Sequence, residues 1–305
     1  MAPLRIGARA SLMSLSQSAP ILAALAPVPT LLRSFAGEDG DREVNRAALS
    51  EDGVFSRQIE TALLAGEIDV AVHCLKDASA HDVPGLSMAA YLHRDDLRDC
   101  LVARDAELRL DTLPPGACVG TASVRRMAAL RAFRPDLDVV PLRGPVSDRL
   151  GALSRHEVDA LILAACSMER LGLSHRINER IHAEIICPPL GAAIIALQTR
   201  EGDSRTRRMI SGLNHPATEI EAEAERFVLR QLGGFCNAPL AGYCTTNEAT
   251  TTTYTVRARS FSADGEMAID VRSTGTDAKR TAAEVCRRLT RHSALNRAAG
   301  QGLVG

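Results

Sequence analysis

The chain has no tryptophan, and aromatic residues make up only 3% of its 305 residues. Flat stacking surfaces for bases or sugars are therefore not expected to be its main binding device. Lysine is almost missing too, because only Lys76 and Lys279 stand beside 34 arginines. With 36 basic against 37 acidic residues, the chain also lacks the net positive charge of general nucleic-acid binders. We therefore expect no nucleic-acid partner.

The eight cysteines form no C-x-x-C pair and show no zinc-like spacing with the eight histidines. We therefore expect no metal site. Scattered single cysteines fit a reducing cytosol better than a disulfide framework. The N-terminus lacks a charged-then-apolar signal pattern, and the apolar stretch 21–32 is short and interrupted by prolines. These absences predict a soluble, cytoplasmic protein without a membrane partner.

Short apolar strands alternate with amphipathic helices through the first two thirds of the chain, which is typical of α/β domains with mostly parallel sheets. Strands are predicted at 4–9, 29–35, 69–75, 86–92, 99–103, 118–122, 137–142, 159–165 and 192–198. Helices are predicted at 11–25, 54–66, 124–133, 146–157 and 167–173. From about residue 216 the pattern changes to a helix, two alternating strands around a turn at 263–266, and a final helix. This predicts a small, separate α+β domain.

Arginines stand at two successive strand-to-helix turns near the middle of the chain. Ser123 is predicted as the N-cap of a helix that carries Arg125 and Arg126, and Arg143 and Arg149 flank the start of the next helix. Helix N-termini have unpaired N–H groups and a partial positive charge, and guanidinium groups match carboxylates or phosphates bidentately. The two turns predict a site for a ligand with several negative charges. The alternative for any single arginine is a solvated group or a surface ion pair.

Seven segments of the chain resemble porphobilinogen deaminase, a family also called hydroxymethylbilane synthase. They are LRIGARASLMSLSQ, EIDVAVHCLKD, RDDLRDCLVA, the run from LPPGACVG to VSDRL, VDALILAACSMERLGL, DSRTRRMISGLNH and AEAERFVLRQLGGFCNAPLAGY. The resemblance extends over nearly the whole chain. It implies two α/β domains like those of periplasmic binding proteins, at 1–93 with 190–214 and at 94–189. A small domain with a cysteine loop would follow at 215–305.

The resemblance implies that Cys236 holds a dipyrromethane cofactor through a thioether. A thiolate is a suitable nucleophile for an electrophilic azafulvene carbon, and neighbouring glycines permit a tight exposed loop. It also implies that Asp77 is the catalytic carboxylate, which would stabilise positive charge beside the pyrrole nitrogens and move protons. Lys76 would keep that carboxylate ionised and bind an acid group of cofactor or substrate. Taken without the resemblance, a free cysteine such as Cys236 is more often an inert buried thiol, and a dipeptide such as Lys76-Asp77 at a strand end is more often a solvated turn.

The remaining implied roles concern the acid groups of the ligands. Besides Lys76, the cofactor would be bound by Ser123, Arg125, Arg126 and Arg149. The substrate would be bound by Arg9, Ser11, Arg143, Arg149 and Arg170. For Arg170 an ordinary place on a helix surface stays open, and His73 is either a hydrogen-bonded core histidine or a member of the site.

The sequence departs from the family at secondary positions. In the family's mobile lid segment, Ser50-Glu51-Asp52 replaces basic character with acidic character, which should weaken attraction for a polycarboxylate. The segment Gly191-Ala192-Ala193 lacks an amide and a hinge-like glycine near the crossing between domains. We expect an active enzyme, and slower or differently gated turnover stays open.

The expected activity is the condensation of four porphobilinogen molecules, one at a time, onto the covalent dipyrromethane. Ammonia leaves at each step, and hydrolysis releases hydroxymethylbilane. The chain is expected to work as a monomer. Two alternatives stay open, a degenerate paralogue that no longer elongates and a non-enzymatic anion-binding module of the periplasmic-binding type. The second has no need for Cys236 or for a C-terminal domain.

Overall fold

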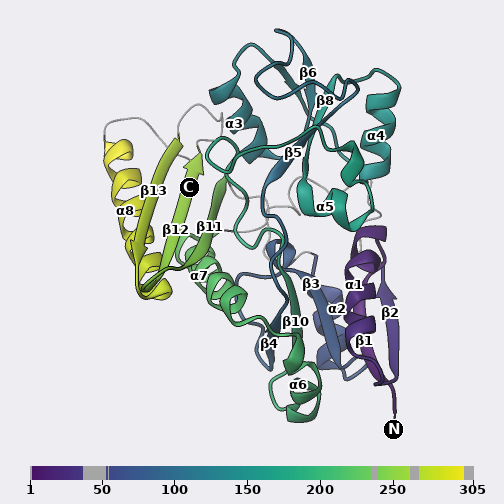
Figure 1. The fold of residues 1–305 in the computed structure, drawn as a ribbon. Coiled ribbons are helices and arrows are strands. Elements are labelled where there is room, and N and C mark those ends of the chain that lie inside the picture. The colour runs from purple at the N-terminus through teal and green to yellow at the C-terminus, as the bar shows by residue number, and fades with distance from the viewer. Residues whose placement is uncertain (1, 37–52, 54, 235–238, 262–267, 299–305) are drawn as a thin grey trace.

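The protein has three parts, which Figure 1 shows in a computed structural model that describes residues 2–36, 53, 55–234, 239–261 and 268–298. Those residues form two five-stranded sheets and one three-stranded sheet. We call the sheet that contains the N-terminal strand, together with its helices, the first lobe. The other five-stranded sheet and its helices are the second lobe, and the three-stranded sheet with two long helices is the C-terminal domain. The lobes lie one above the other in Figure 1, with the C-terminal domain beside them.

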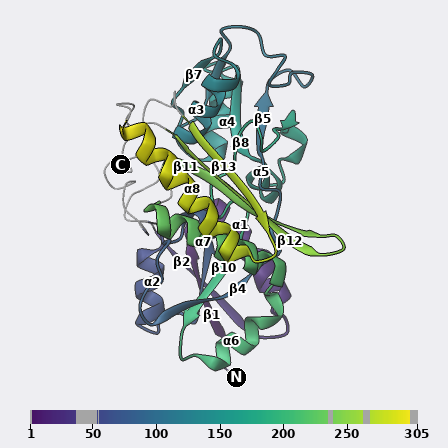
Figure 2. The same ribbon diagram turned by 90° about the vertical axis from the view of Figure 1, so that its left-hand side faces the viewer.

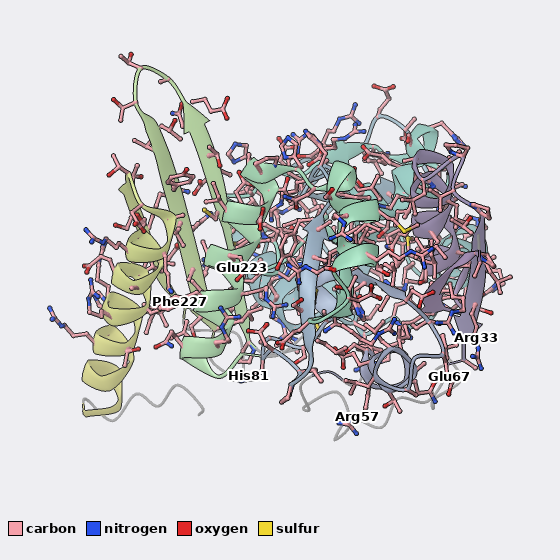
Figure 3. The ribbon with its side chains drawn as sticks, turned by 90° about the horizontal axis from the view of Figure 1, so that it is seen from below. Arg33, Arg57, Glu67, His81, Glu223 and Phe227 are labelled. Carbon is pink, nitrogen blue, oxygen red and sulfur yellow. The ribbon has the colours of Figure 1, made fainter. Side chains whose placement is uncertain are left out.

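The first lobe has the strand order β2-β1-β3-β10-β4. Its strands are β1 (Leu4–Arg9), β2 (Thr30–Phe35), β3 (Val70–Cys74), β4 (Leu86–Tyr91) and β10 (Ile195–Arg200). Its helices are α1 (Leu12–Ala24), α2 (Arg57–Leu64) and α6 (Ser204–Ile210), with short 3-10 turns η2 (Leu75–Asp77) and η4 (Ser211–Leu213). At the edge strand β2, Arg33 forms a 2.8 Å ion pair with Glu67 (Figure 3).

The second lobe has the strand order β7-β6-β8-β5-β9. Its strands are β5 (Asp99–Ala103), β6 (Cys118–Gly120), β7 (Asp138–Val140), β8 (Ala160–Ala164) and β9 (Glu179–Arg180). Its helices are α3 (Val124–Phe133), α4 (Val146–Ser154) and α5 (Ala165–Arg170), with a 3-10 turn η3 (Ser174–Arg176). The two-residue strand β9 was not predicted from the sequence.

Apolar side chains fill both faces of each large sheet, which explains why the central strands are almost continuously hydrophobic. In the first lobe, Val72 packs with Ile21 on one face, whereas the neighbouring Ala71 packs with Leu63 on the other. Successive side chains of a strand point to opposite faces, so both must be apolar when helices cover both sides. Each fully buried Val, Leu or Ile side chain contributes roughly 1.5–3 kcal/mol to the stability of the fold.

The C-terminal domain consists of β11 (Leu240–Glu248), β12 (Thr252–Phe261), β13 (Ala268–Gly275), α7 (Pro216–Leu232) and α8 (Ala278–Ala298). The strands are antiparallel, and α8 runs across one face of their sheet (Figure 2). The strand β11 was not predicted from the sequence, because its residues 245–248 are polar and do not alternate with apolar ones. The predicted turn at 263–266 lies outside the described residues. The other face of this sheet packs on the second lobe through a cluster that includes Ala128, Tyr243 and Phe261.

The predicted fold class is confirmed, and each large sheet holds one strand that runs against the other four. In the first lobe β1 is parallel to β2 and β3, but β10 is antiparallel to β3 and β4. In the second lobe β6 is parallel to β7 and β8, but β5 is antiparallel to β8 and β9. In each large sheet four strands therefore share one direction, so both sheets are mostly parallel, as predicted. Periodicity shows that a strand exists but not which way it runs, so the antiparallel β10 and β5 were not singled out from the sequence. The residue limits of the three domains stay a prediction.

Within the part of the chain that the structure describes, no helix is both long enough and apolar enough to cross a membrane.

Candidate functional site

A cavity of about 370 Å³ lies between the two lobes, at the edge of each sheet where the parallel strands end. Ligands bind in this position in open α/β sheets. Ten of the eleven residues predicted for the site line this cavity: Arg9, Ser11, Lys76, Asp77, Ser123, Arg125, Arg126, Arg143, Arg149 and Arg170. The eleventh, Cys236, lies outside the described residues, as does the segment Ser50-Glu51-Asp52. The structure thus gathers the predicted residues, whereas their individual roles stay predictions.

The turn that carries Lys76 and Asp77 follows β3 directly and is partly buried. Its first amide, Leu75 N, donates to the carbonyl oxygen of Ile194 at 2.9 Å. Gly191 also lies against it with a φ of 76°, and a Cβ there would come within 2.8 Å of Lys76 N. Glycine is therefore required at 191 both for its backbone conformation and for this close approach.

Helix α7 of the C-terminal domain braces the segment that follows Asp77. The buried Arg226 donates from Nη2 to Asp82 Oδ1 at 2.6 Å and from Nη1 to the Ser79 carbonyl at 3.4 Å. Arg230 Nη1 donates to the carbonyl of Ala80 at 3.3 Å. Figure 3 shows His81 of this segment close to α7, where Glu223 and Phe227 are labelled. The sequence contained no signal for this contact, because it joins residues about 150 positions apart.

Two further residues of the first lobe line the cavity in specific settings. Arg9 ends β1, and its guanidinium carbon lies 4.7 Å from the centre of the Phe55 ring. Ser11 is the N-cap of α1, where its Oγ accepts a hydrogen bond from Ser14 N at 3.2 Å. The Ser11 hydroxyl therefore already has a structural role beside any contact with a ligand.

His73 meets both descriptions that its sequence position left open. It lines the cavity, yet it is buried, and its Nε2 lies 3.0 Å from Gln198 Oε1. Burial lowers the pKa of His73 to about 4. The imidazole is therefore neutral at physiological pH, which makes it a poor binder of carboxylates.

At the first arginine turn, a single carboxylate binds both guanidinium groups. Asp99 Oδ1 lies 2.6 Å from Arg126 Nη2, and Asp99 Oδ2 lies 2.8 Å from Arg125 Nη2. Although burial opposes its charge, these two arginines hold the pKa of Asp99 at about 2. Ser123 occupies the predicted N-cap position of α3, but its side chain makes no capping hydrogen bond. Asp99 was not predicted as a site residue. An acidic residue at the start of a strand does not reveal, from sequence alone, which basic side chain it will pair with.

At the second arginine turn, no such carboxylate is present among the described residues. Arg149 Nε donates to the carbonyl of Gly144 at 2.7 Å, and Arg143 is exposed. Burial, followed by the nearby charges of Arg126 and Arg143, lowers the pKa of Arg149 to about 10. Arg149 therefore remains charged at neutral pH without an ion pair to any carboxylate that the structure describes.

Arg170 is not an ordinary helix-surface residue, because its side chain is only 11% exposed. Its Nη2 lies 2.7 Å from Asp95 Oδ2 and donates to the carbonyl of Ala193 at 3.3 Å. Asp95 and Ala193 belong to the two segments that cross between the lobes. Arg170 thus connects the second lobe to both crossings.

The seven described cysteines are all free, and burial raises the pKa of each thiol. The pKa of Cys74, which lines the cavity, is raised to about 12. These thiols are protonated at neutral pH and are therefore weak nucleophiles. Among the described residues, no group of three or more His, Cys, Asp or Glu side chains could hold a metal ion.

Fold and cavity together define an α/β protein with two lobes and a cationic, arginine-lined cavity between them. A family model described as "Porphobilinogen deaminase, dipyromethane cofactor binding domain" matches residues 4–208. Porphobilinogen deaminase 2 of Streptomyces coelicolor is 42% identical over 274 residues, 88% of this chain and 86% of that protein. Porphobilinogen deaminase of Syntrophotalea carbinolica is 39% identical over 254 residues, 82% of this chain and 80% of that protein. The chain belongs to the porphobilinogen deaminase family.

Solved structures with similar folds are more distant. A methionine-binding lipoprotein of Bacillus subtilis has a TM-score of 0.40 at 13% identity, covering 72% of this chain and 93% of that one. A periplasmic binding protein of Brucella ovis with glutathione bound has a TM-score of 0.40 at 16% identity, covering 76% of this chain and 70% of that one. Likeness at this level does not bear on function.

Proposed function

We propose that this protein is a hydroxymethylbilane synthase that works as a monomer in the cytoplasm. It condenses four porphobilinogen molecules, one at a time, onto a dipyrromethane joined to Cys236 by a thioether, and then releases hydroxymethylbilane by hydrolysis. The proposal is carried by the gathering of Asp77, Lys76 and the arginines of both turns in one cavity of a porphobilinogen deaminase family member. A degenerate paralogue and a simple anion-binding module are not favoured, since the site residues are present and the chain matches enzymes over most of its length.

The residues present fit a cofactor that carries several carboxylates. Arg149 is partly buried and charged, and no described carboxylate offsets it. An unpaired buried charge is costly, and a ligand carboxylate would relieve that cost. Arg143 and Lys76 line the same cavity and would take further acid groups.

The cysteines support Cys236 as the attachment point. Burial raises the pKa of all seven described thiols, and that of Cys187 reaches about 12. Forming a thioether requires a thiolate, so none of these seven is suited to it. Cys236 is the cysteine that the family resemblance assigns to this role.

When bound, the dipyrromethane supplies the reactive pyrrole carbon to which each new ring is added. In every cycle the carbon–nitrogen bond of porphobilinogen breaks, ammonia leaves, and a carbon–carbon bond to the growing chain forms. Asp77 stabilises the positive charge that develops on the substrate as ammonia leaves, and it accepts the proton lost from the attacked ring. Lys76, next to Asp77 in the same cavity, binds an acid group of the cofactor or substrate. The arginines hold the acid side chains so that the reacting carbons meet.

Turnover of porphobilinogen by the purified protein tests this function. We expect hydroxymethylbilane to be released, and Asp77→Asn to lower kcat by about 10²–10⁴-fold. Asp111→Asn is a matched control, because Asp111 is exposed and does not line the cavity. It should keep kcat within about threefold of wild type. No hydroxymethylbilane from the wild type, or wild-type kcat in Asp77→Asn, would contradict the proposal.

A further inference from the structure

Asp99 is an unexpected member of an anion-binding cavity. Of the described residues that line the cavity, only Asp77 and Asp99 carry a carboxylate. Asp99 is 1% exposed and is the first residue of β5. A negative charge in this place repels the acid groups that the cavity has to bind, so it needs a reason to be there.

The contacts of Asp99 fix two arginines at two points each. Asp99 binds one terminal nitrogen of Arg125 and one of Arg126, at 2.8 and 2.6 Å. The other terminal nitrogen of Arg125 donates to the carbonyl of Cys187 at 2.5 Å. The other terminal nitrogen of Arg126 donates to the carbonyl of Ile162 at 3.1 Å. Both planar groups are therefore held in one orientation before a ligand arrives, which reduces the entropy lost on binding.

We propose that Arg125 and Arg126, which the resemblance assigns to the cofactor, also bind the carboxylates of incoming porphobilinogen in the same cavity, and that Asp99 is the positioning residue that holds both arginines in the orientation this requires. This inference rests on the proposed function and names a determinant of binding in the same cavity. Asp99 acts through the two arginines and touches no reacting atom.

The affinity of Asp99→Asn for an anionic substrate, relative to that of wild type, distinguishes this positioning role from simple charge compensation. Asp99→Asn removes one negative charge and so makes the net charge of the cavity more positive by one, while it keeps the shape of the side chain. If Asp99 only offset excess charge, an anionic substrate would bind the variant as well or more tightly, because Coulomb attraction increases. If Asp99 orients the arginines, the substrate binds more weakly in spite of the added positive charge.

The experiment compares wild type, Asp99→Asn and Asp159→Asn, with rates normalised to the fraction of protein that carries the cofactor by intact mass. Asp159 is a matched control in the same lobe that pairs with Arg104 at 2.8 Å and does not line the cavity. We expect Asp99→Asn to raise the KM for porphobilinogen by about tenfold with kcat within about threefold, and Asp159→Asn to change neither. An unchanged or lower KM in Asp99→Asn would overturn the proposal.

A double-mutant cycle provides a second test, which does not rest on the single variant Asp99→Asn alone. In the variant with both Asp99→Asn and Arg126→Gln, two amides replace the ion pair between these residues, and Arg125 keeps its hydrogen bond to the carbonyl of Cys187. Because Asp99 acts through Arg126, the double variant should raise KM by less than the product of the two single effects. Effects that multiply in full would overturn the proposal.

The two proposals can fail separately. A wild-type protein that binds porphobilinogen but releases no hydroxymethylbilane contradicts the enzymatic function. The calorimetric Kd of porphobilinogen for wild type and Asp99→Asn then tests Asp99, and an equal or tighter Kd in the variant overturns its role. A wild-type protein that does not bind porphobilinogen overturns both.

Discussion

The two arginine turns of the second lobe look alike in sequence but differ in their electrostatics. Each follows a strand, opens a helix and lines the same cavity. At the first turn, Arg125 and Arg126 share the buried carboxylate of Asp99. At the second turn, Arg149 is held only by a carbonyl oxygen among the described residues. The first turn is thus fixed and partly neutralised, and the second keeps an uncompensated charge for a ligand.

The antiparallel strand β5 causes this difference. Asp99 pairs with Ala164, the last residue of β8, so the amino end of β5 lies at the edge where β6 and β8 end. A parallel strand would have brought its carboxyl end there instead. The first lobe repeats the arrangement, because β10 pairs Ile195 with Cys74 and so brings Gly191 to the turn of Lys76. In both lobes the antiparallel strand delivers a residue that shapes the site.

The largest effect on stability is expected from Arg126→Gln. This change breaks a buried ion pair and leaves Asp99 with one partner, so we expect the free energy of unfolding to fall by about 3 kcal/mol. Urea unfolding followed by circular dichroism measures the loss. If Arg126→Gln were as stable as wild type, the first turn would not differ from the second in the way described.

Acid unfolding should reveal the Asp99 carboxylate. Its pKa lies at about 2 in the folded protein against an ordinary 3.8, so its contribution is complete above 3.8 and is lost as the pH falls through 2. The difference corresponds to about 2.5 kcal/mol. Between pH 5 and pH 2, Asp99→Asn should therefore lose about 2 kcal/mol less stability than wild type, because the folded carboxyl is still half ionised at pH 2.

Arg149→Gln serves as the control for this acid series. The pKa of Arg149, lowered to about 10, lies far outside the range between pH 5 and pH 2. The unfolding free energy of Arg149→Gln should therefore fall between pH 5 and pH 2 as steeply as that of wild type. Equal slopes for wild type and Asp99→Asn would show that Asp99 is not charged and paired in the folded protein.

Arg149→Gln should affect binding and spare stability. Removing an uncompensated buried charge relieves a desolvation cost, so the free energy of unfolding should stay the same or rise. Losing one ligand contact should raise the KM for porphobilinogen about tenfold, or about 1.4 kcal/mol. Steady-state kinetics and urea unfolding on the same samples measure both. A loss of stability as large as that of Arg126→Gln would remove the distinction between the turns.

The smallest effect is expected at Ala193, which lines the cavity but belongs to neither turn. Its φ of 63° is a left-handed conformation that costs a side chain with a Cβ. Ala193→Gly should raise the free energy of unfolding by about 0.5–1 kcal/mol after the greater freedom of unfolded glycine is subtracted. Ala192→Gly, next to it and without a positive φ, should instead lower it. Equal changes in both variants would show that Ala193 is not strained.

The sequence predicted those features that depend on residues close together in the chain, such as strands, helices and helix starts. Alternation of strands and helices predicted α/β domains, the family resemblance predicted that there are two, and the spacing of Ser123, Arg125 and Arg126 placed these residues at a helix start. The partner of a charged side chain could not be predicted, because Asp99 meets Arg126 from 27 residues away, across a sheet whose strand direction periodicity does not show. The same limit concealed Asp95 as the partner of Arg170.

The most direct test of the central claim is the intact mass of the protein after expression in a host that produces porphobilinogen. We expect wild type and the control Cys118→Ser to carry the added mass of a dipyrromethane, and Cys236→Ser to carry none. An unmodified wild-type protein, or a modified Cys236→Ser variant, would contradict the claim that this cavity builds a pyrrole chain tethered to Cys236.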